Sequence, residues 1–558
     1  MALATWDKLA SLQQCSSTTK LESIFLLAIS IYFVFLGGQI AVMVTDFIQG
    51  MFVIVAFMVI LVFIFWMFDW VDIVQTLSAA PNPETQSMLD PMKTEKLDSF
   101  NPWFFIIGAF GAIYGSNAWQ GSQGYKCSAS SAHEAKMAGI LGEWRGLVLM
   151  LVTMLLPIGA YVIMHHPDHV ATASAVNATL SDITANTSQK IADQMTVPVA
   201  LSYSLPIAIK GLMAAVMLAA FISTHDTYLH SWGALFIQDV VLPFRKKPFE
   251  TKQHIKLLRW SIMFVAVFIF LFSIFFRQNE KILLFFGITG AIYVGGAGSA
   301  IIGGLYWKRG STGGAWFALA SGAALAIGGL ILGQIWEPWA YPFMAEHAPW
   351  LLNAITYLLE DVAGSIKGIN WQVTPDKFPI DGQWMWMFSM LIAIVGYIGF
   401  SLYSWLVLNK PEHDMDRLLH RGKWAITGDH VGDTIEPVSG WRAILPTKEF
   451  TTGDKCIYYA KLVWTIFWFS VFVFGTIYAF NYDVSLETWM EFWWWKVMLT
   501  IVIGIGTTIW FFIGGMIDIK KLYKRLRTME RDHRDIGMVI DHHDLSEEST
   551  NDDDDSSS

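Results

Sequence analysis

The sequence predicts an all-α polytopic membrane protein, and two observations carry that prediction. Hydrophobic residues make up 54% of the chain and charged residues only 15%. Uninterrupted apolar stretches of about 20 residues, long enough to cross the hydrocarbon core of a bilayer as a helix, recur along the chain and predict about eleven membrane-spanning helices. We expect these helices over residues 22–41, 45–68, 102–119, 139–165, 203–224, 257–277, 280–305, 313–335, 383–408, 457–481 and 491–517.

Two neighbouring glycines, Gly37 and Gly38, stand between the first two stretches. Glycine permits a sharp turn of the backbone. Residues 22–41 and 45–68 therefore form either two helices or one broken helix.

The loops differ in their content of Lys and Arg, which predicts the orientation of the chain. One set of loops holds roughly two dozen of these residues, whereas the opposite loops hold few, such as Lys93, Lys190 and Lys367. Cytoplasmic loops are the ones enriched in Lys and Arg, so we expect the N-terminus outside and the C-terminus in the cytoplasm. The expected cytoplasmic segments are 120–138, 241–259, 306–312, 409–456 and 518–558.

The helix expected over 203–224 ends in a group of oxygen atoms. Ala220, Ser223 and Thr224 stand at positions i, i+3 and i+4, so a carbonyl and two hydroxyls fall on one helix face. Uncharged oxygens that converge near membrane depth suit a hard monovalent cation that must bind and then leave. The alternative is that both hydroxyls bond back to carbonyls one turn earlier, as is common in membrane helices.

Two carboxylates accompany this group. Asp226 follows it directly and either guides a departing cation or pairs with the neighbouring His225. Asp46 opens the stretch 45–68, where it caps the helix together with Thr45, lies on an ion pathway, or does both. Ionisable residues within membrane segments are functional by default, so we assign both carboxylates to an ion pathway.

A polar segment, Gly-Ser-Asn-Ala-Trp-Gln-Gly, ends the stretch 102–119. Glycines, amides and an aromatic residue at this depth disfavour a continuous helix, and broken helices are tolerated in membranes where they line a cavity. The alternative is an ordinary helix end followed by a polar loop. The candidate solute-binding residues are Ser116, Asn117, Trp119 and Gln120.

Five segments in this order resemble the sodium:solute symporter family, of the sodium/glucose and sodium/proline symporter type. They are the Gly-Gly to Thr-Asp segment over 37–49, the polar segment over 115–124, the helix that starts at Lys136, the Leu-Pro to Ser-Thr helix over 205–224, and the glycine-rich segment over 287–314, which contains Gly-Leu-Tyr-Trp-Lys-Arg. The resemblance implies a leucine-transporter-like fold, in which an inverted repeat of core helices is surrounded by further helices.

The resemblance also implies roles for these residues. It implies sodium binding by the oxygens of 220–224, a sodium exit path past Asp46, and solute contacts on the half-broken helix at 115–120. Sugar-transporting relatives carry an aromatic residue at the position of Gly115. Its absence disfavours a sugar as the solute.

Aligned by its motifs, the chain begins at the fourth core helix, so its first repeat is incomplete. The family's first core helix supplies further carbonyls to the sodium site, and a hard cation needs about five or six oxygens. The resemblance therefore implies a truncated gene, a separate N-terminal polypeptide that completes the transporter, or a chain that is not an active carrier. The expected regions are an external segment 1–21, symporter core helices 22–335, peripheral helices 336–517 with a cytoplasmic loop 409–456, and a disordered acidic cytoplasmic tail 518–558.

The function expected from these features is sodium-coupled symport of a small polar organic solute across the cell membrane. We expect no enzymatic activity, because no nucleophile–base pair stands within the helices. Sodium is the coupling ion, and no other metal or cofactor is expected. The expected partners are the solute, sodium and the lipid bilayer, without nucleic acid. The alternative is a transport-incompetent membrane sensor, or a subunit completed by a separate N-terminal polypeptide.

The charge distribution predicts that residue 246 is cytoplasmic and residue 190 external. On intact cells, an impermeant thiol reagent should label a Lys190→Cys variant and leave a Lys246→Cys variant unlabelled. The unsubstituted chain, with its 3 native cysteines, gives the background. Labelling at 246 and not at 190 would refute the orientation.

Overall fold

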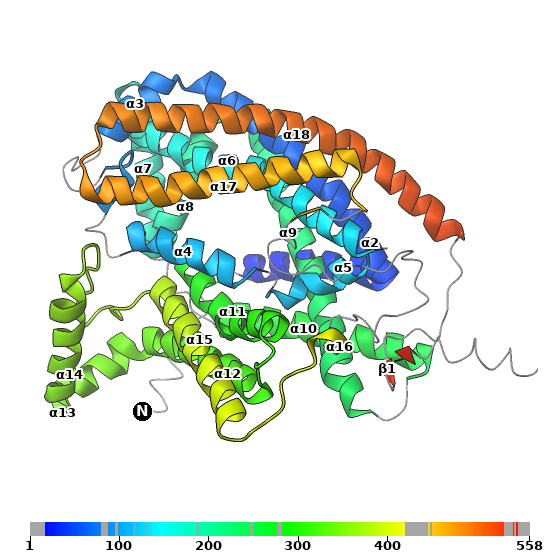
Figure 1. Cartoon of the computed structure of the whole chain (residues 1–558). Coiled ribbons are helices and arrows are strands. Elements are labelled where there is room, and N and C mark those ends of the chain that lie inside the picture. Colours follow the sequence, from blue (N-terminus) through cyan, green and yellow to red (C-terminus); the bar gives the residue numbers. More distant parts are fainter. Residues whose placement is uncertain are drawn as a thin grey trace, which may run out of the picture. The chain divides into compact units, whose positions relative to one another are not determined.

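The computed structural model describes most of the chain, and Figure 1 shows it as ribbons coloured along the sequence. Most of the described residues lie in helices, which confirms the all-α fold class. The described residues are 17–79, 87–94, 99–116, 118–129, 131–186, 189–245, 249–275, 282–418, 445–446, 449–528, 539–540 and 543–544.

The α-helices are α2 (Ser17–Met67), α3 (Trp70–Ser78), α4 (Pro102–Tyr114), α5 (Gln123–Cys127), α6 (Ala132–His165), α7 (Val170–Asn186), α8 (Gln189–Ser204), α9 (Ile207–Leu235), α10 (Thr251–Phe275), α11 (Ile282–Tyr306), α12 (Thr312–Ile335), α13 (Tyr341–His347), α14 (Pro349–Thr356), α15 (Gly382–Leu406), α16 (Met415–Leu418), α17 (Thr452–Asn481) and α18 (Leu486–Thr528). Short 3₁₀ or π-helical turns are η2 (Pro91–Thr94), η3 (Gln120–Ser122), η4 (Pro167–His169), η5 (Phe236–Val241), η6 (Leu242–Phe244), η7 (Trp336–Ala340), η8 (Tyr357–Val362) and η9 (Ala363–Ser365). A small antiparallel hairpin pairs β1 (Val539–Ile540) with β2 (His543–Asp544).

Within the described residues, 9 helices are long and apolar enough to cross a membrane. The first of them, Ile24–Met67, contains both of the first two predicted stretches, and each of the others matches one further prediction. The predicted stretch 102–119 is only the 13-residue helix α4, because the chain leaves helical geometry after Tyr114. These two elements account for the difference from the expected count.

Gly38 divides α2 into two helical segments. Its backbone angles, φ 55° and ψ −143°, are not helical, and residues with a side chain rarely adopt this conformation. Residues 22–68 therefore form two helical segments that meet at Gly38, under the single label α2.

One compact unit of the chain contains residues 1–76, 141–276 and 492–558. In this unit α2 packs along α9, and α10 contacts both helices. An apolar core joins α2, α6 and α18. Its buried side chains are Ile54, Leu61, Val148, Leu151, Val152, Leu155 and Val497.

The other compact unit contains residues 77–140 and 277–491. Here α11, α12 and α15 pack against one another, and α4 contacts α15 and α11. A Cβ added to Gly296 of α11 would lie 2.5 Å from the Leu319 Cα, and one added to Gly322 of α12 would lie 2.7 Å from the Gly296 nitrogen. The two backbones are therefore in contact, as glycines permit between membrane helices.

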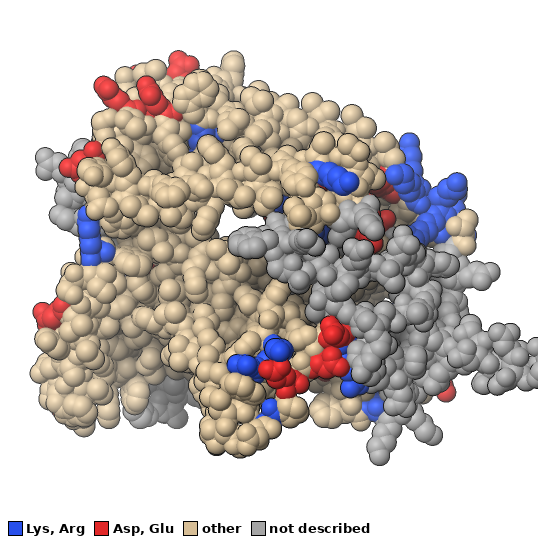
Figure 2. Space-filling model, viewed as in Figure 1, with Lys and Arg blue, Asp and Glu red and all other residues tan. Residues whose placement is uncertain are grey.

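Both units expose large apolar side chains to their surroundings. Trp66 is 80% exposed and Trp316 is 70% exposed, and Figure 2 shows wide areas without charged residues. Water-soluble monomers rarely expose continuous apolar patches of this kind. The surface is instead that of a protein whose helices face lipid.

The contact between α11 and α12 predicts different effects for two glycines of the same helix. Gly296→Ala should strongly lower the thermal stability of the protein in detergent, because the added methyl group meets backbone atoms of α12 that cannot move aside. Gly304→Ala is the matched control: a Cβ there meets nothing within 4 Å, and alanine is the better helix former by about 1 kcal/mol. Equal thermal unfolding temperatures for the two variants would contradict the packing.

Candidate functional site

The oxygen group predicted on α9 is divided between two faces of the helix. Ala220 and Thr224 are exposed, whereas Ser223 is half-buried. The Ser223 hydroxyl does not bond back to its own helix but donates to Oδ1 of Asp46 at 2.6 Å. Ser223 therefore links α9 to α2.

Asp46 accepts a second hydrogen bond from the same helix. The Thr227 hydroxyl donates to Oδ2 of Asp46 at 2.7 Å, so both carboxylate oxygens are bonded to α9. Asp46 lies inside α2 and does not cap a helix. Its expected capping partner, Thr45, directs its hydroxyl to the carbonyls of Ala41 and Val42.

Asp226 is a fully buried carboxylate of this region. It is 0% exposed, and neither of its carboxylate oxygens accepts a hydrogen bond from a described residue. Thr45 and Thr227 lie beside it, but each hydroxyl has a single proton and donates it elsewhere. His225, the partner considered from the sequence, instead bonds to the Phe221 carbonyl through Nδ1 at 2.8 Å.

Negative charge is concentrated here. The charge of Asp46 acts on Asp226, and the guanidinium of Arg145, from α6, acts on Asp46. A buried carboxylate without a donor is costly unless a cation or a proton compensates it. The group is called the Asp46–Asp226 cluster below, and its members are Thr45, Asp46, Ser223, Asp226 and Thr227.

The side chains of the Asp46–Asp226 cluster offer only carboxylate and hydroxyl oxygens, the ligands that hard cations prefer. In the part of the chain that the structure describes, no group of three or more His, Cys, Asp or Glu residues is placed to hold a metal ion. The donor set therefore fits a hard cation with few charged ligands, such as sodium, better than a transition metal.

The chain breaks its helical path directly after α4, as the sequence predicts. Gly115 ends the helix with φ −84° and ψ 2°, and Trp119 is extended, with φ −77° and ψ 108°. Helical structure resumes only in η3 and α5. Turns replace the regular helix here, with hydrogen bonds from the Ser116 N–H to the Ile113 carbonyl and from the Ala118 N–H to the Gly115 carbonyl.

The predicted solute-binding residues belong to this break. Ser116 and Gln120 are exposed, and Trp119 is half-buried with its indole nitrogen close to Gly121. Asn117 lies outside the described residues. Contact of these side chains with a solute stays a prediction.

Tyr114, a residue that the sequence did not single out, fixes the end of α4. Its buried hydroxyl lies 2.7 Å from the Gly295 carbonyl and 2.7 Å from the Ser299 hydroxyl, and it accepts a hydrogen bond from the Ser299 backbone N–H at 3.0 Å. A Cβ on Gly298 would meet the tyrosine ring. The last turn of α4 is thereby held against α11, immediately before the break.

Sequence reasoning also missed Thr227, for which a signal existed. Thr227 stands four residues after Ser223, on the same helix face. Extending the polar stripe by one turn would have found it. The approach of Arg145 to Asp46 has no such signal, because the two residues belong to separate helices.

The long apolar helices of the described residues define a multi-pass membrane protein. The chain belongs to the sodium:solute symporter family, whose model matches residues 13–322. This match confirms the resemblance drawn from the motifs. The activity of this family is sodium-coupled transport of solutes. No curated protein matches the chain in sequence.

The contacts of Tyr114 predict the effect of removing its hydroxyl. Tyr114→Phe keeps the ring in place but leaves the Ser299 N–H and the Gly295 carbonyl without this partner, so it should lower the free energy of unfolding by about 1–3 kcal/mol. Tyr306→Phe is the control, because Tyr306 is 84% exposed. Thermal unfolding in detergent measures both, and an unchanged Tyr114→Phe variant would show that the hydroxyl contacts do not stabilise this joint.

Proposed function

We propose that this chain is a sodium-coupled symporter of a small polar organic solute and that sodium passes through the Asp46–Asp226 cluster. Membership of the symporter family supports the coupling ion. The observation that carries the site is Asp226, a fully buried carboxylate that accepts no hydrogen bond from a described residue. Within a membrane such a group marks an ion pathway.

Ser223 connects the oxygens predicted on α9 with the Asp46–Asp226 cluster. On α9 it stands beside the exposed Ala220 and Thr224, and its hydroxyl contacts Asp46. A sodium ion that first meets the exposed oxygens of Ala220 and Thr224 can pass to the Ser223 hydroxyl and from there to Asp46 and Asp226. Exchange of one ligand at a time avoids the full cost of removing an ion from polar surroundings.

The solute is proposed to bind at the break after α4. Ser116, Asn117 and Gln120 offer hydrogen-bond donors and acceptors, and Trp119 offers an apolar face with one N–H donor. Gly115 provides no aromatic ring above this segment, which favours a small polar solute over a sugar. Coupling then requires that sodium and solute stabilise the same conformation.

The orientation proposed for the chain places the N-terminus outside and the C-terminus in the cytoplasm, on the basis of the basic loops. Residues 22–335 are proposed as the symporter core and 336–517 as peripheral helices. The alternative function is a transport-incompetent sensor, or a subunit that a separate N-terminal polypeptide completes. Sodium binding without sodium-stimulated uptake by the chain alone would favour that alternative.

Removal of the hydroxyls tests the ion site. Ser223→Ala combined with Thr224→Ala should weaken sodium binding by at least about tenfold, because each lost ligand is worth 1 kcal/mol or more. Asp226→Asn removes one of the two carboxylates and should weaken sodium binding to at least a similar extent. Binding of radioactive sodium to the purified protein in detergent measures both.

Thr153→Ala is the matched control, because the Thr153 hydroxyl bonds only to carbonyls of its own helix. It should leave sodium binding unchanged. If the double alanine variant and Asp226→Asn both bind sodium like the unsubstituted protein, the proposed site is wrong. Uptake of a panel of small polar solutes into vesicles under a sodium gradient, compared with a potassium gradient, tests the transport function itself.

A further inference from the structure

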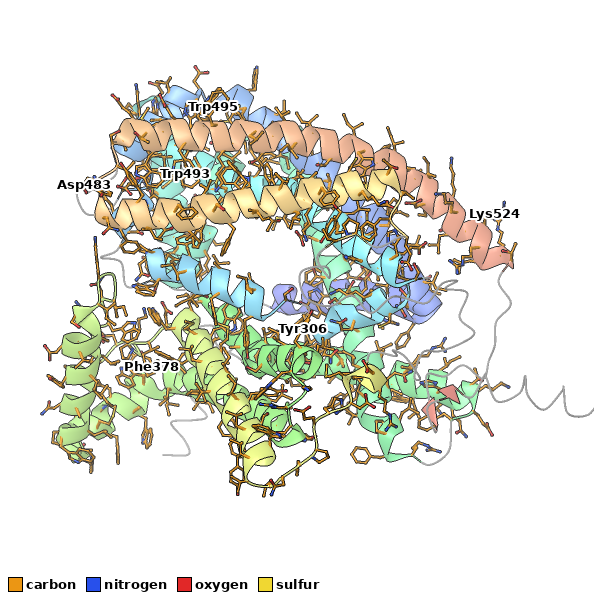
Figure 3. All side chains as sticks on the ribbon, viewed as in Figure 1. Tyr306, Phe378, Asp483, Trp493, Trp495 and Lys524 are labelled. Atoms are coloured by element: carbon orange, nitrogen blue, oxygen red, sulfur yellow. The ribbon has the colours of Figure 1, made fainter. Side chains whose placement is uncertain are left out.

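The length of α18 places its two ends at opposite surfaces of a bilayer. Trp493 and Trp495 lie near its beginning and Lys524 near its end (Figure 3). From Trp495 to Lys520 an α-helix rises about 38 Å, and a bilayer with its headgroups is about 40–45 Å thick. With the tryptophans at one interface, where this residue is enriched, Lys520 reaches the headgroups of the other.

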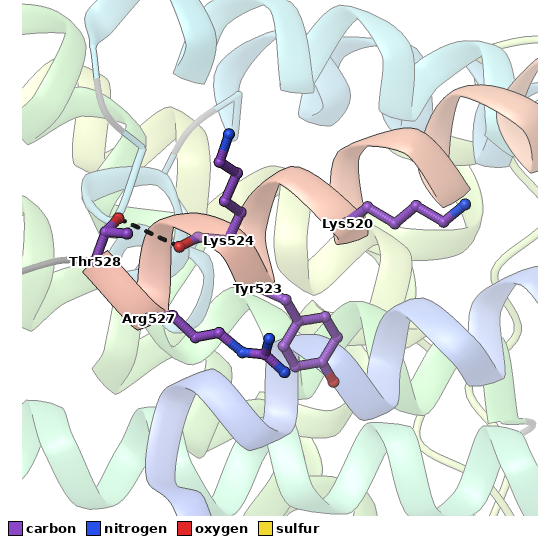
Figure 4. A pocket seen from close by; sticks show the side chains of 5 residues that line it. All are labelled: Lys520, Tyr523, Lys524, Arg527 and Thr528. Atoms are coloured by element: carbon purple, nitrogen blue, oxygen red, sulfur yellow. Dashed lines mark hydrogen bonds between the residues drawn. The ribbon is translucent and has the colours of Figure 1, made fainter.

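Cationic side chains gather on one face of this last part of α18. Lys520, Tyr523, Lys524 and Arg527 follow the spacing i, i+3, i+4 and i+7, so they share a helix face. Together with Thr528 they line a pocket (Figure 4). All five are exposed, and Figure 2 shows Lys and Arg side chains gathered at this end of the helix. Lys520, Lys524 and Arg527 are called the basic stripe below.

The basic stripe differs from other basic residues at helix ends. Lys308 and Arg309 both contact Glu412, at 2.8 and 3.2 Å, so a carboxylate neutralises them. Lys521, next to the stripe but on another face, pairs with Asp518 at 3.1 Å. Among the described residues, none of the three members of the stripe forms an ion pair.

We propose that the basic stripe binds the headgroup phosphates of anionic phospholipids. Lys and Arg just beyond a membrane span attract anionic lipid, and the planar guanidinium of Arg527 can hold two phosphate oxygens at once. Tyr523 adds a hydroxyl donor and an aromatic ring of the kind enriched at membrane interfaces. Lipid is favoured over a soluble anion because the span holds the stripe at headgroup depth.

A second occupant of suitable charge exists within the chain. The C-terminal tail carries Asp552, Asp553, Asp554 and Asp555, and these carboxylates could neutralise the stripe in place of lipid. The pairing would be intramolecular and independent of the membrane. The two occupants are separated by varying the lipid and the tail independently.

The experiment titrates the purified full chain in detergent with phosphatidylglycerol or phosphatidylcholine and counts bound lipids by native mass spectrometry. The unsubstituted protein should prefer phosphatidylglycerol, and a triple variant with Lys520→Gln, Lys524→Gln and Arg527→Gln should lose roughly tenfold or more of this affinity. Lys521→Gln should leave the affinity unchanged. The charge-conserving triple variant with Lys520→Arg, Lys524→Arg and Arg527→Lys should retain it.

Four results would overturn the proposal. The first is equal binding of the two lipids, and the second is undiminished phosphatidylglycerol binding by the triple Gln variant. The third is preferential binding that appears only after the four tail aspartates are changed to Asn, which would make the tail the occupant. Displacement of the lipid by millimolar inorganic phosphate would equally count against a lipid site, since the stripe would then recognise phosphate without its membrane anchor.

Discussion

Asp46 accepts hydrogen bonds from both Ser223 and Thr227, and these contacts fix the rotation of α9 about its axis relative to α2. Once that rotation is set, Asp226 must point inward and Thr224 outward, as their burial shows. A rotation by one residue, about 100°, would break both hydrogen bonds and leave the Asp46 carboxylate unsatisfied in apolar surroundings. The polar pairing of α2 with α9 thus decides which side chains can reach an ion.

How far the sequence predicts this molecule depends on whether a feature lies within one helix or between two. The spans follow from runs of apolar residues, and the break after α4 follows from Gly115 and its polar neighbours. By contrast, the division of Ala220 and Thr224 from Ser223 depends on which neighbour α9 faces. The hydrogen bond from Ser223 to Asp46 joins residues far apart in sequence, and no local pattern encodes it.

Irregular backbone at membrane depth has to be supported by its surroundings. Here Tyr114 supplies part of that support, since its hydroxyl is bonded to Gly295 and Ser299 of α11. The neighbouring glycines of α11 allow this helix to approach both α4 and α12 closely. Close packing before the break thus accompanies an exposed polar segment after it, in which Ser116 and Gln120 are exposed.

The charges around the Asp46–Asp226 cluster have an electrical consequence. In the proposed pathway, each sodium ion that enters brings one positive charge to two buried carboxylates, one of which, Asp46, also lies in the field of the Arg145 guanidinium. Filling and emptying the cluster would then move charge within the membrane field. A charge that crosses the whole field gains or loses about 2.3 kcal/mol for each 100 mV, so the resting voltage of the cell would act directly on the occupancy of this helix pair.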